Sequence, residues 1–434
     1  MNILSSPDQF EPQRGTLSAV VILNDFGWVN GGQSQVAIES ALQLKLRGLD
    51  VHFVAGRGPL DERLVAAGIA CHLAGSHDIL SDPSRSRAAV TGIWNAAAAR
   101  TLGDCLASLD LATTAIHVHG WAKALSPSIG PVVTGSQAAH VYTLHEYFLA
   151  CPNGGFYNYQ TGAICRLRAL GAQCLATNCD ARGYHHKLWR AARQAVLWNA
   201  GRMPRDLREI IYLAPEQLDI MGPYVPPQAN WHFLPNPAGP RPAQRMAAEH
   251  NQTYLFVGRL SPEKGAVVAA RAAADAGVPI AFCGDGEERD AVLSANPQAQ
   301  MLGWLGQDEL AAWMQRARCL VFPSLWYETY GLVVADALRI GLPVLVSRSC
   351  VAASLLEHGI SGELVPAGDV QAWAAALSRL RSDELTAAYS EGAFTRGQGL
   401  PGQAEYTSRL IEIYTSAIDR KQRGPAPQLS EAIQ

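Results

Sequence analysis

The sequence predicts an α/β protein of two domains, each built around a parallel β-sheet. The chain has 434 residues, which is more than one hydrophobic core usually supports. In both halves, short apolar runs typical of buried strands alternate with stretches typical of helices. A proline-rich segment, residues 230–242, ends a helical region between the halves and is the expected linker.

The first half opens with a βαβ unit whose first loop carries several glycines. Two later apolar runs continue the predicted sheet, and each ends in a polar cluster that contains histidine. Ligands gather at the carboxyl ends of such strands. The expected elements are a strand at 19–23, a loop at 27–32, a helix at 35–46 and strands at 51–54, 115–118 and 140–144.

The second half repeats the alternation of strands and helices. Strands are expected at 254–257, 279–283, 299–302, 319–322, 343–346 and 362–365, and a helix at 403–420 closes the chain. We find no short-period repeat, only two α/β halves.

Composition limits the class of protein. The sequence is 48% hydrophobic and 17% charged, and no apolar run reaches the roughly 18 residues that would span a bilayer. A net charge of −3 argues against a general attraction to nucleic acid. Because the first residues lack the features of a secretory signal, we expect a cytoplasmic protein with nine reduced cysteines.

The most informative motif is residues 322–338, where Glu328 precedes a predicted helix and Asp336 follows eight positions later. The helix is expected at 332–340, with Gly331 before it and Gly341 ending it. Free amides at its N-terminus would face anionic oxygens. The motif therefore suits a nucleotide diphosphate.

Two glycine-bearing loops follow predicted strands of the second half. The first, residues 256–265, places Arg259 and Lys264 where cations could neutralise a diphosphate, although such charges could also be a solvated surface loop. The second contains Gly284-Asp-Gly286, which permits close backbone approach to a ligand but, taken alone, is more typical of a simple turn.

The order of these pieces resembles the family 4 (group 1) retaining glycosyltransferases of the GT-B fold. That resemblance implies two Rossmann-like domains facing across a cleft, with a C-terminal helix that returns to the first domain. The matching pieces are Gly31-Gly32, Thr143-Leu-His145, Gly258-Arg259 with Lys264-Gly265, Gly284-Asp-Gly286, Pro323-Ser324 and the motif from Glu328 to Asp336.

The resemblance also implies a domain plan. It consists of a flexible N-terminus (1–16), an acceptor domain (17–235), a nucleotide-sugar donor domain (236–402), a helix crossing back (403–422) and a disordered tail (423–434).

Roles follow position by position from the same resemblance. Arg259 and Lys264 would bind the donor pyrophosphate, Glu328 the sugar hydroxyls and Asp336 the ribose, although the family usually has glutamate at this last position. His145 would lie near the reacting sugar. We expect His145, Glu328, Lys264 and Arg259 to be catalytic. The expected donor-binding set is Gly31, Gly32, Gly258, Arg259, Lys264, Gly284, Gly286, Glu328, Tyr330, Gly331, Leu332 and Asp336.

Each assignment has a structural alternative. His145 could be a buried histidine at a strand end, and Glu328 and Asp336 a solvated pair on a helix. His117 and His119 alternate as strand residues do, so they share one face and could line the cleft or lie buried.

The donor is expected to need no catalytic metal, because no Asp-X-Asp pair is placed to clamp it and family members resemble one another in lacking one. No further cofactor is expected. Since no carboxylate can be placed beneath the anomeric carbon, we expect retention by front-face transfer, in which the departing phosphate oxygen helps deprotonate the acceptor.

Two further clusters stand outside this motif set. Cys151, Cys165, Cys174 and Cys179 could hold a structural zinc ion or be buried free thiols. Residues 182–208 carry a formal excess of six positive charges, with Trp189 and Trp198 among them. This segment could contact anionic lipid at the inner face of the cytoplasmic membrane, or be a solvated helix face.

Competing functions were weighed on the same residues. A nicotinamide oxidoreductase should show Gly-X-Gly-X-X-Gly after its first strand, and residues 24–32 do not fit. A GT-B nucleotide-sugar epimerase and a non-catalytic nucleotide-sugar-binding protein remain as alternatives. The resemblance suggests a glycan or lipid-linked oligosaccharide acceptor in bacterial surface polysaccharide synthesis, and no nucleic acid partner.

Overall fold

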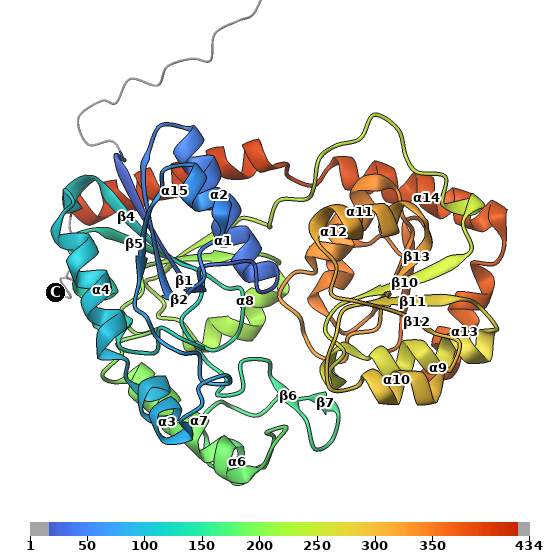
Figure 1. Cartoon of the computed structure of the whole chain (residues 1–434), viewed down its shortest axis with the longest axis horizontal. Helices are drawn as coiled ribbons and strands as arrows, with labels where there is room; N and C mark the ends of the chain where they lie inside the picture. Colours follow the sequence, from blue (N-terminus) through green and yellow to red (C-terminus); the bar gives the residue numbers. More distant parts are fainter. Residues whose placement is uncertain (1–16, 424–434) are drawn as a thin grey trace, which may run out of the picture.

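The computed structural model describes residues 17–423. The two ends expected to be flexible or disordered lie outside the described residues, apart from Arg423, which ends the last helix. Figure 1 shows two lobes side by side, the first drawn in blue and green and the second in yellow and orange. Within residues 17–423, no helix is both long and apolar enough to cross a bilayer.

The first lobe contains a seven-stranded sheet in which every neighbouring pair is parallel. β1 is buried along its whole length, as expected for the central strand of a sheet covered on both faces. In spatial order the strands are β3 (Ala70–Leu73), β2 (Asp50–Arg57), β1 (Ala19–Phe26), β4 (Thr114–Val118), β5 (Ala139–Thr143), β8 (Glu209–Tyr212) and β9 (Asn230–Phe233).

The helices of this lobe include α1, which follows the glycine loop, and α7, which carries much of the basic segment. A short hairpin, β6 (Tyr157–Asn158) and β7 (Ala163–Ile164), extends from the lobe. The helices are α1 (Gly32–Leu46), α2 (Glu62–Ala66), α3 (Arg85–Ile93), α4 (Ala96–Ala107), α5 (Ile129–Gly135), α6 (Ala172–Ala176), α7 (Tyr184–Trp198) and α8 (Glu216–Met221).

The second lobe contains a six-stranded parallel sheet whose order reverses beside its first strand, as in a doubly wound fold. In spatial order the strands are β12 (Gln300–Gly303), β11 (Ile280–Cys283), β10 (Thr253–Val257), β13 (Ala317–Phe322), β14 (Val344–Ser347) and β15 (Gly362–Val365). The helices are α9 (Ala266–Ala276), α10 (Arg289–Ala295), α11 (Gln307–Gln315), α12 (Leu332–Ile340), α13 (Val370–Arg379) and α14 (Asp383–Gln398).

The last helix, α15 (Gln403–Arg423), runs back to the first lobe, where it packs on α1, β4 and β5 (Figure 1). Its buried residues recur at helical spacing and form one apolar stripe. At its end Lys421 donates to the carbonyls of Ser136 and Ala138, and Arg420 pairs with Glu209. The predicted returning helix and the two-sheet α/β architecture are therefore confirmed.

The expected linker at 230–242 is wrong in its first residues. Asn230–Phe233 is strand β9, which pairs in parallel with β8 at the edge of the first sheet. The prolines that suggested a linker begin only at Pro235, after this strand. The linker therefore starts after Phe233.

The basic segment does not present all of its charge to solvent. Lys187 and Arg193 are buried, and Arg190 pairs with Asp180 at 2.7 Å. Arg193 donates to the Ala122 carbonyl and lies between aromatic rings, which explains how its long side chain is accommodated inside the lobe. The formal excess of six positive charges therefore overstates the charge that this segment presents to solvent, because charge counted along a sequence does not show which cations are paired or buried.

A second buried charge lies directly beside the predicted His145. The Oε1 atom of Glu146 is buried and has no hydrogen-bond partner among the described residues. Burial raises the pKa of Glu146 to about 7, and the neighbouring Asp25 carboxylate adds to the rise, against the opposing charges of Lys123 and Arg193. In the folded protein this carboxyl group therefore retains its proton to a higher pH than in the unfolded chain.

We predict that this proton makes stability depend on pH. Between about pH 4.5 and pH 7 the native state binds more protons than the unfolded state, so the free energy of unfolding should fall as pH rises, by about 1–3 kcal/mol. Urea unfolding at several pH values should show a smaller fall in Glu146→Gln. The exposed Glu62→Gln is the control, and an equal change in both variants would contradict the assignment.

Candidate functional site

Two loops of the second lobe meet at the carboxylate of Glu328. Its Oε1 atom accepts hydrogen bonds from Lys264 Nζ at 2.7 Å and from Ser324 Oγ at 2.5 Å. Lys264 follows β10, whereas Ser324 and Glu328 follow β13. These strands are parallel neighbours, so their carboxyl ends bring the two loops together.

The backbone of Glu328 is held in an unusual conformation. Its φ is 56°, in the left-handed region that residues with a Cβ atom adopt at a cost of about 1–3 kcal/mol. The Tyr147 hydroxyl donates to the Glu328 carbonyl oxygen at 2.6 Å, while Lys264 and Ser324 hold the side chain. Strained residues that are fixed from several sides in this way are typical of ligand sites.

The first lobe touches the same loop at two more places. Thr329 Oγ1 donates to the His145 carbonyl at 3.1 Å. At Gly32 an added Cβ would lie 2.7 Å from Leu332 Cδ1, so a larger residue there would require the Leu332 side chain to shift. Gly31 lies beside it with a φ of 119°. The predicted Gly31-Gly32 loop therefore does reach the start of α12.

The N-terminus of α12 offers unsatisfied amide groups. Gly331, its N-cap, has a φ of 95° and supplies no side chain, and no acidic residue lies in the first turn. An added Cβ at Gly331 would lie 2.7 Å from Ala352 Cβ. The first amides of α12 thus lack a side-chain acceptor, which is the usual condition for binding an anion.

The two predicted glycine loops pack against each other. A Cβ on Gly284 would lie 2.0 Å from the Gly258 carbonyl oxygen, and one on Gly286 would lie 2.3 Å from the Leu260 carbonyl oxygen. Arg259 lies in the first of these loops, directly after Gly258, and one of its guanidinium nitrogens donates to Glu263 at 3.1 Å. Its side chain is 64% exposed, so most of its donors face solvent.

Trp326 is the aromatic neighbour of this group. Lys264 Nζ lies 5.1 Å from the centroid of the Trp326 ring, within the range of a cation–π contact. A Cβ on Gly155, in the first lobe, would lie 2.8 Å from the same ring. Trp326 therefore packs between Lys264 and the first lobe.

His145 joins a chain of buried histidines. Its Nε2 atom lies 2.9 Å from His119 Nδ1, and the His119 and His117 ring centroids are 3.9 Å apart. Burial lowers the pKa of His145 to about 3, so its imidazole is neutral at pH 7. A neutral imidazole can donate or accept one hydrogen bond but carries no charge to a phosphate.

His117 is buried, and both nitrogens of its ring have hydrogen-bond partners. Its Nδ1 atom is 2.6 Å from the Tyr414 hydroxyl of α15, and its Nε2 atom is 2.7 Å from Thr143 Oγ1. Of the two alternatives weighed for His117, the structure thus favours the buried one. His119 differs, because its second nitrogen is buried without a partner among the described residues.

Asp336 and Tyr330 differ in their hydrogen bonding. The Asp336 carboxylate accepts from the Gly239 amide of the linker at 2.8 Å, and burial raises its pKa to about 6. Tyr330 is buried, and its hydroxyl has no partner in the described chain. The predicted ribose contact of Asp336 therefore stays a prediction, and it would compete with the linker amide.

The cysteine cluster surrounds a lysine. Lys187 Nζ donates to Cys174 Sγ at 3.3 Å and to Cys179 Sγ at 3.1 Å. Cys151 is also buried, and Cys165 is partly exposed. This ammonium group gives two of the thiols a cationic neighbour without any metal, and the structural zinc ion stays a prediction.

The sequence motifs did not single out Tyr147, Trp326 or Thr329. Tyr147 and Thr329 bridge the lobes by hydrogen bonds, and Trp326 does so by packing. One signal for Tyr147 was available, because it lies two positions beyond His145 at the same strand end. Nothing in the local sequence around Thr329 indicates its partner, which is 184 positions away.

Comparison with known proteins supports the fold described above. Residues 242–395 match the family model of glycosyl transferases group 1. A D-inositol 3-phosphate glycosyltransferase from Thermobispora bispora is 31% identical over 247 residues, which are 50% of this chain and 55% of the relative. That alignment therefore spans about half the length of the relative. The enzyme of the same name from Mycobacterium marinum is 27% identical over 429 residues, covering 91% of this chain and 84% of the relative.

Among solved structures, Anabaena Alr3699/HepE in complex with UDP and glucose superposes with a TM-score of 0.64. The match covers 92% of this chain and 100% of that one at 16% identity, a level that establishes the fold alone. The predicted GT-B fold is thereby confirmed. Residues 242–395 thus resemble the glycosyl transferases group 1 family, and the chain as a whole has the GT-B fold.

Proposed function

We propose that the protein is a retaining glycosyltransferase that moves a sugar from a nucleotide diphosphate sugar to a hydroxyl group of a glycan or lipid-linked acceptor. The observation that carries the proposal is the Lys264–Glu328 pair beside the uncapped start of α12. It places a cation, a carboxylate and free amides within one loop system, as a sugar diphosphate requires.

The Lys264–Glu328 ion pair suits a site in which Lys264 exchanges the carboxylate for a bound pyrophosphate. Without a donor, Glu328 neutralises Lys264 at 2.7 Å. A pyrophosphate bound to Lys264 would compete with Glu328, and the released carboxylate oxygen would then accept hydrogen bonds from the sugar hydroxyls. Arg259 and the first amides of α12 would supply the remaining donors to the phosphates. No metal ion is needed for this charge balance.

Retention is supported by what the neighbouring side chains can do. Ser324 still holds Glu328 once the donor has taken Lys264, and the neutral His145 is bonded to His119. We infer a front-face transfer in which the bond from the anomeric carbon to the diphosphate breaks as the bond to the acceptor oxygen forms on the same face. The acceptor proton moves to the departing phosphate oxygen, so Glu328 and His145 position the sugar without forming a covalent intermediate.

The acceptor is proposed from the relatives' names and the exposed surface. The enzymes from Thermobispora bispora and Mycobacterium marinum are named for D-inositol 3-phosphate, and another relative is named for amylovoran biosynthesis. An acceptor panel should therefore contain inositol phosphate as well as glycans. Contact with anionic lipid at the inner face of the cytoplasmic membrane stays part of the proposal, supported by the exposed Arg182, Arg205 and Arg208.

We predict that UDP stabilises the protein through Lys264. At about 100 times its Kd, UDP should add about 2.7 kcal/mol to the free energy of unfolding, which a thermal melt detects. Lys264→Ala should lose most of this shift, because it removes the cation beside α12. Lys45→Ala, in the last turn of α1, is the matched control, and GDP and ADP serve as alternative bases. Equal shifts in both variants would contradict the site.

We predict that Tyr147→Phe weakens donor binding. The change removes the hydrogen bond to the Glu328 carbonyl, worth about 0.5–1.5 kcal/mol, so the KM for the donor should rise about 2- to 10-fold. Tyr142→Phe is the control, since the Tyr142 hydroxyl bonds Trp121 within the first lobe. That variant should lower stability but leave the donor KM unchanged. If the donor KM rose more in Tyr142→Phe than in Tyr147→Phe, the bridging role of Tyr147 would be refuted.

We predict that the product keeps the anomeric configuration of the donor, as proton NMR of the purified product would show. An inverted centre would overturn the retaining assignment. The same reaction without acceptor tests the epimerase alternative, because an epimerase would convert the sugar of the donor, whereas a transferase should release UDP only at a slow hydrolytic rate. Binding without turnover across the acceptor panel would favour the non-catalytic alternative.

A further inference from the structure

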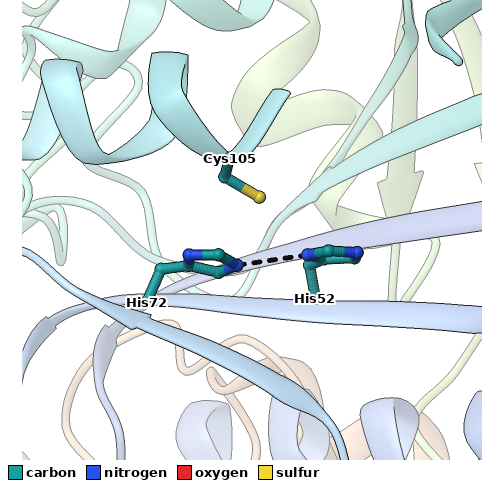
Figure 2. A group of neighbouring side chains, drawn as sticks. All are labelled: His52, His72 and Cys105. Atoms are coloured by element: carbon teal, nitrogen blue, oxygen red, sulfur yellow. Dashed lines mark hydrogen bonds between the residues drawn. The ribbon is translucent and has the colours of Figure 1, made fainter. Parts of the chain in front are cut away.

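A second chemical cluster lies in the first lobe, outside the donor loops. It consists of His52 on β2, His72 on β3 and Cys105 on α4 (Figure 2). In the parallel pair of β2 and β3, His52 stands opposite Ala70 and His72 opposite Val54, so both imidazoles project from the same face of the sheet. The buried residues of α4 recur at helical spacing and include Cys105, which faces the two rings.

The distances within this cluster suit a metal ion. His52 Nδ1 lies 3.1 Å from His72 Nε2, and one ligand atom from each of the three residues lies within 4.8 Å of the other two. With zinc to nitrogen bonds of about 2.0–2.1 Å, two nitrogen ligands in a tetrahedral site are roughly 3.3 Å apart. The two imidazole nitrogens thus already stand close to that separation, and the Cys105 sulfur lies within 4.8 Å of a nitrogen of each ring.

The surrounding groups orient the ligands. Asp50 Oδ2 lies 3.2 Å from His52 Nε2, so this nitrogen carries the proton and the Nδ1 lone pair faces His72. At zinc sites a carboxylate commonly accepts a hydrogen bond from the ring nitrogen of a histidine ligand that does not bind the metal. Asp50 is otherwise exposed, and no lysine or arginine forms an ion pair with it in the described chain.

Burial sets the protonation states that a metal would meet. It lowers the pKa of His72, with the neighbouring His52 adding to the effect, so the imidazole is neutral. It raises the pKa of the Cys105 thiol to about 12, with the Asp50 charge contributing. A bound cation would therefore have to displace the thiol proton and the shared imidazole proton, which makes binding stronger at higher pH.

We infer that His52, His72 and Cys105 bind one Zn²⁺ ion, with Asp50 orienting His52 and the fourth coordination position open to water. Among residues 17–423 this is the one group of three histidine, cysteine or acidic side chains with such spacing. The ion would join α4 to the outer strands β2 and β3. Because His52 lies in the N-terminal half of β2, away from the carboxyl-end loops, this site stabilises the lobe and is independent of the transfer reaction.

The experiment uses the full chain, stripped of metal with a chelator and titrated with Zn²⁺ and, separately, with Co²⁺. We expect about one equivalent of bound ion, a higher melting temperature, and a sulfur-to-cobalt charge-transfer band. His72→Gln and Cys105→Ala should each lower the affinity at least 100-fold and abolish the band. Asp50→Asn should lower the affinity about 10-fold without abolishing it.

Two controls separate this site from other thiols. Cys71→Ala changes a neighbouring cysteine on β3 that packs on the opposite core, and it should leave the band intact. The double change Cys174→Ala with Cys179→Ala removes the thiols beside Lys187 and should also leave it intact. A band lost only in the double variant would place the metal at that cysteine cluster and overturn the inference. So would binding below about a tenth of an equivalent, or unchanged binding in a folded His72→Gln variant.

Discussion

The position of Glu328 depends on contacts from three directions. Lys264 and Ser324 hold its carboxylate, and Tyr147 of the opposite lobe holds its carbonyl oxygen. Together these bonds offset the cost of a left-handed backbone in a residue with a Cβ atom. Because Gly331 and the start of α12 follow directly, the same contacts aim the free amides of that helix. A single strained residue therefore sets the geometry of the loops that follow β10 and β13 and joins them to the first lobe.

The opposite wall of this region is built from buried polar groups that are mostly neutral. His117, His119 and His145 are linked in a row, and burial keeps the pKa of each below its usual value. In a region of low dielectric constant, one charged imidazole would be costly. Neutral rings instead offer hydrogen bonds without adding positive charge. Lys264 and Arg259, the two cations described at this site, both belong to the second lobe.

The return of α15 explains how the two lobes are held near each other. Tyr414 bonds His117, Arg420 pairs with Glu209, and Lys421 caps two carbonyls near β5. The chain therefore connects the lobes twice, once through the linker after β9 and once through α15. Tyr147 and Thr329 add direct hydrogen bonds between the lobes to these two connections.

The sequence alone determined the class of fold, most strand positions and the bounds of α12, because periodicity, glycine and proline act over a few neighbouring residues. It also determined which loops carry cations and glycines. Tertiary structure decided which of these meet: Glu328 contacts residues 64 and 181 positions away, and strand order rather than spacing brings them together. The sequence did not show that Arg193 is buried, nor that the residues from Asn230 to Phe233 form an edge strand rather than linker. Which residues contact each other depends on the folded chain, because residues that are far apart in the sequence become neighbours only on folding.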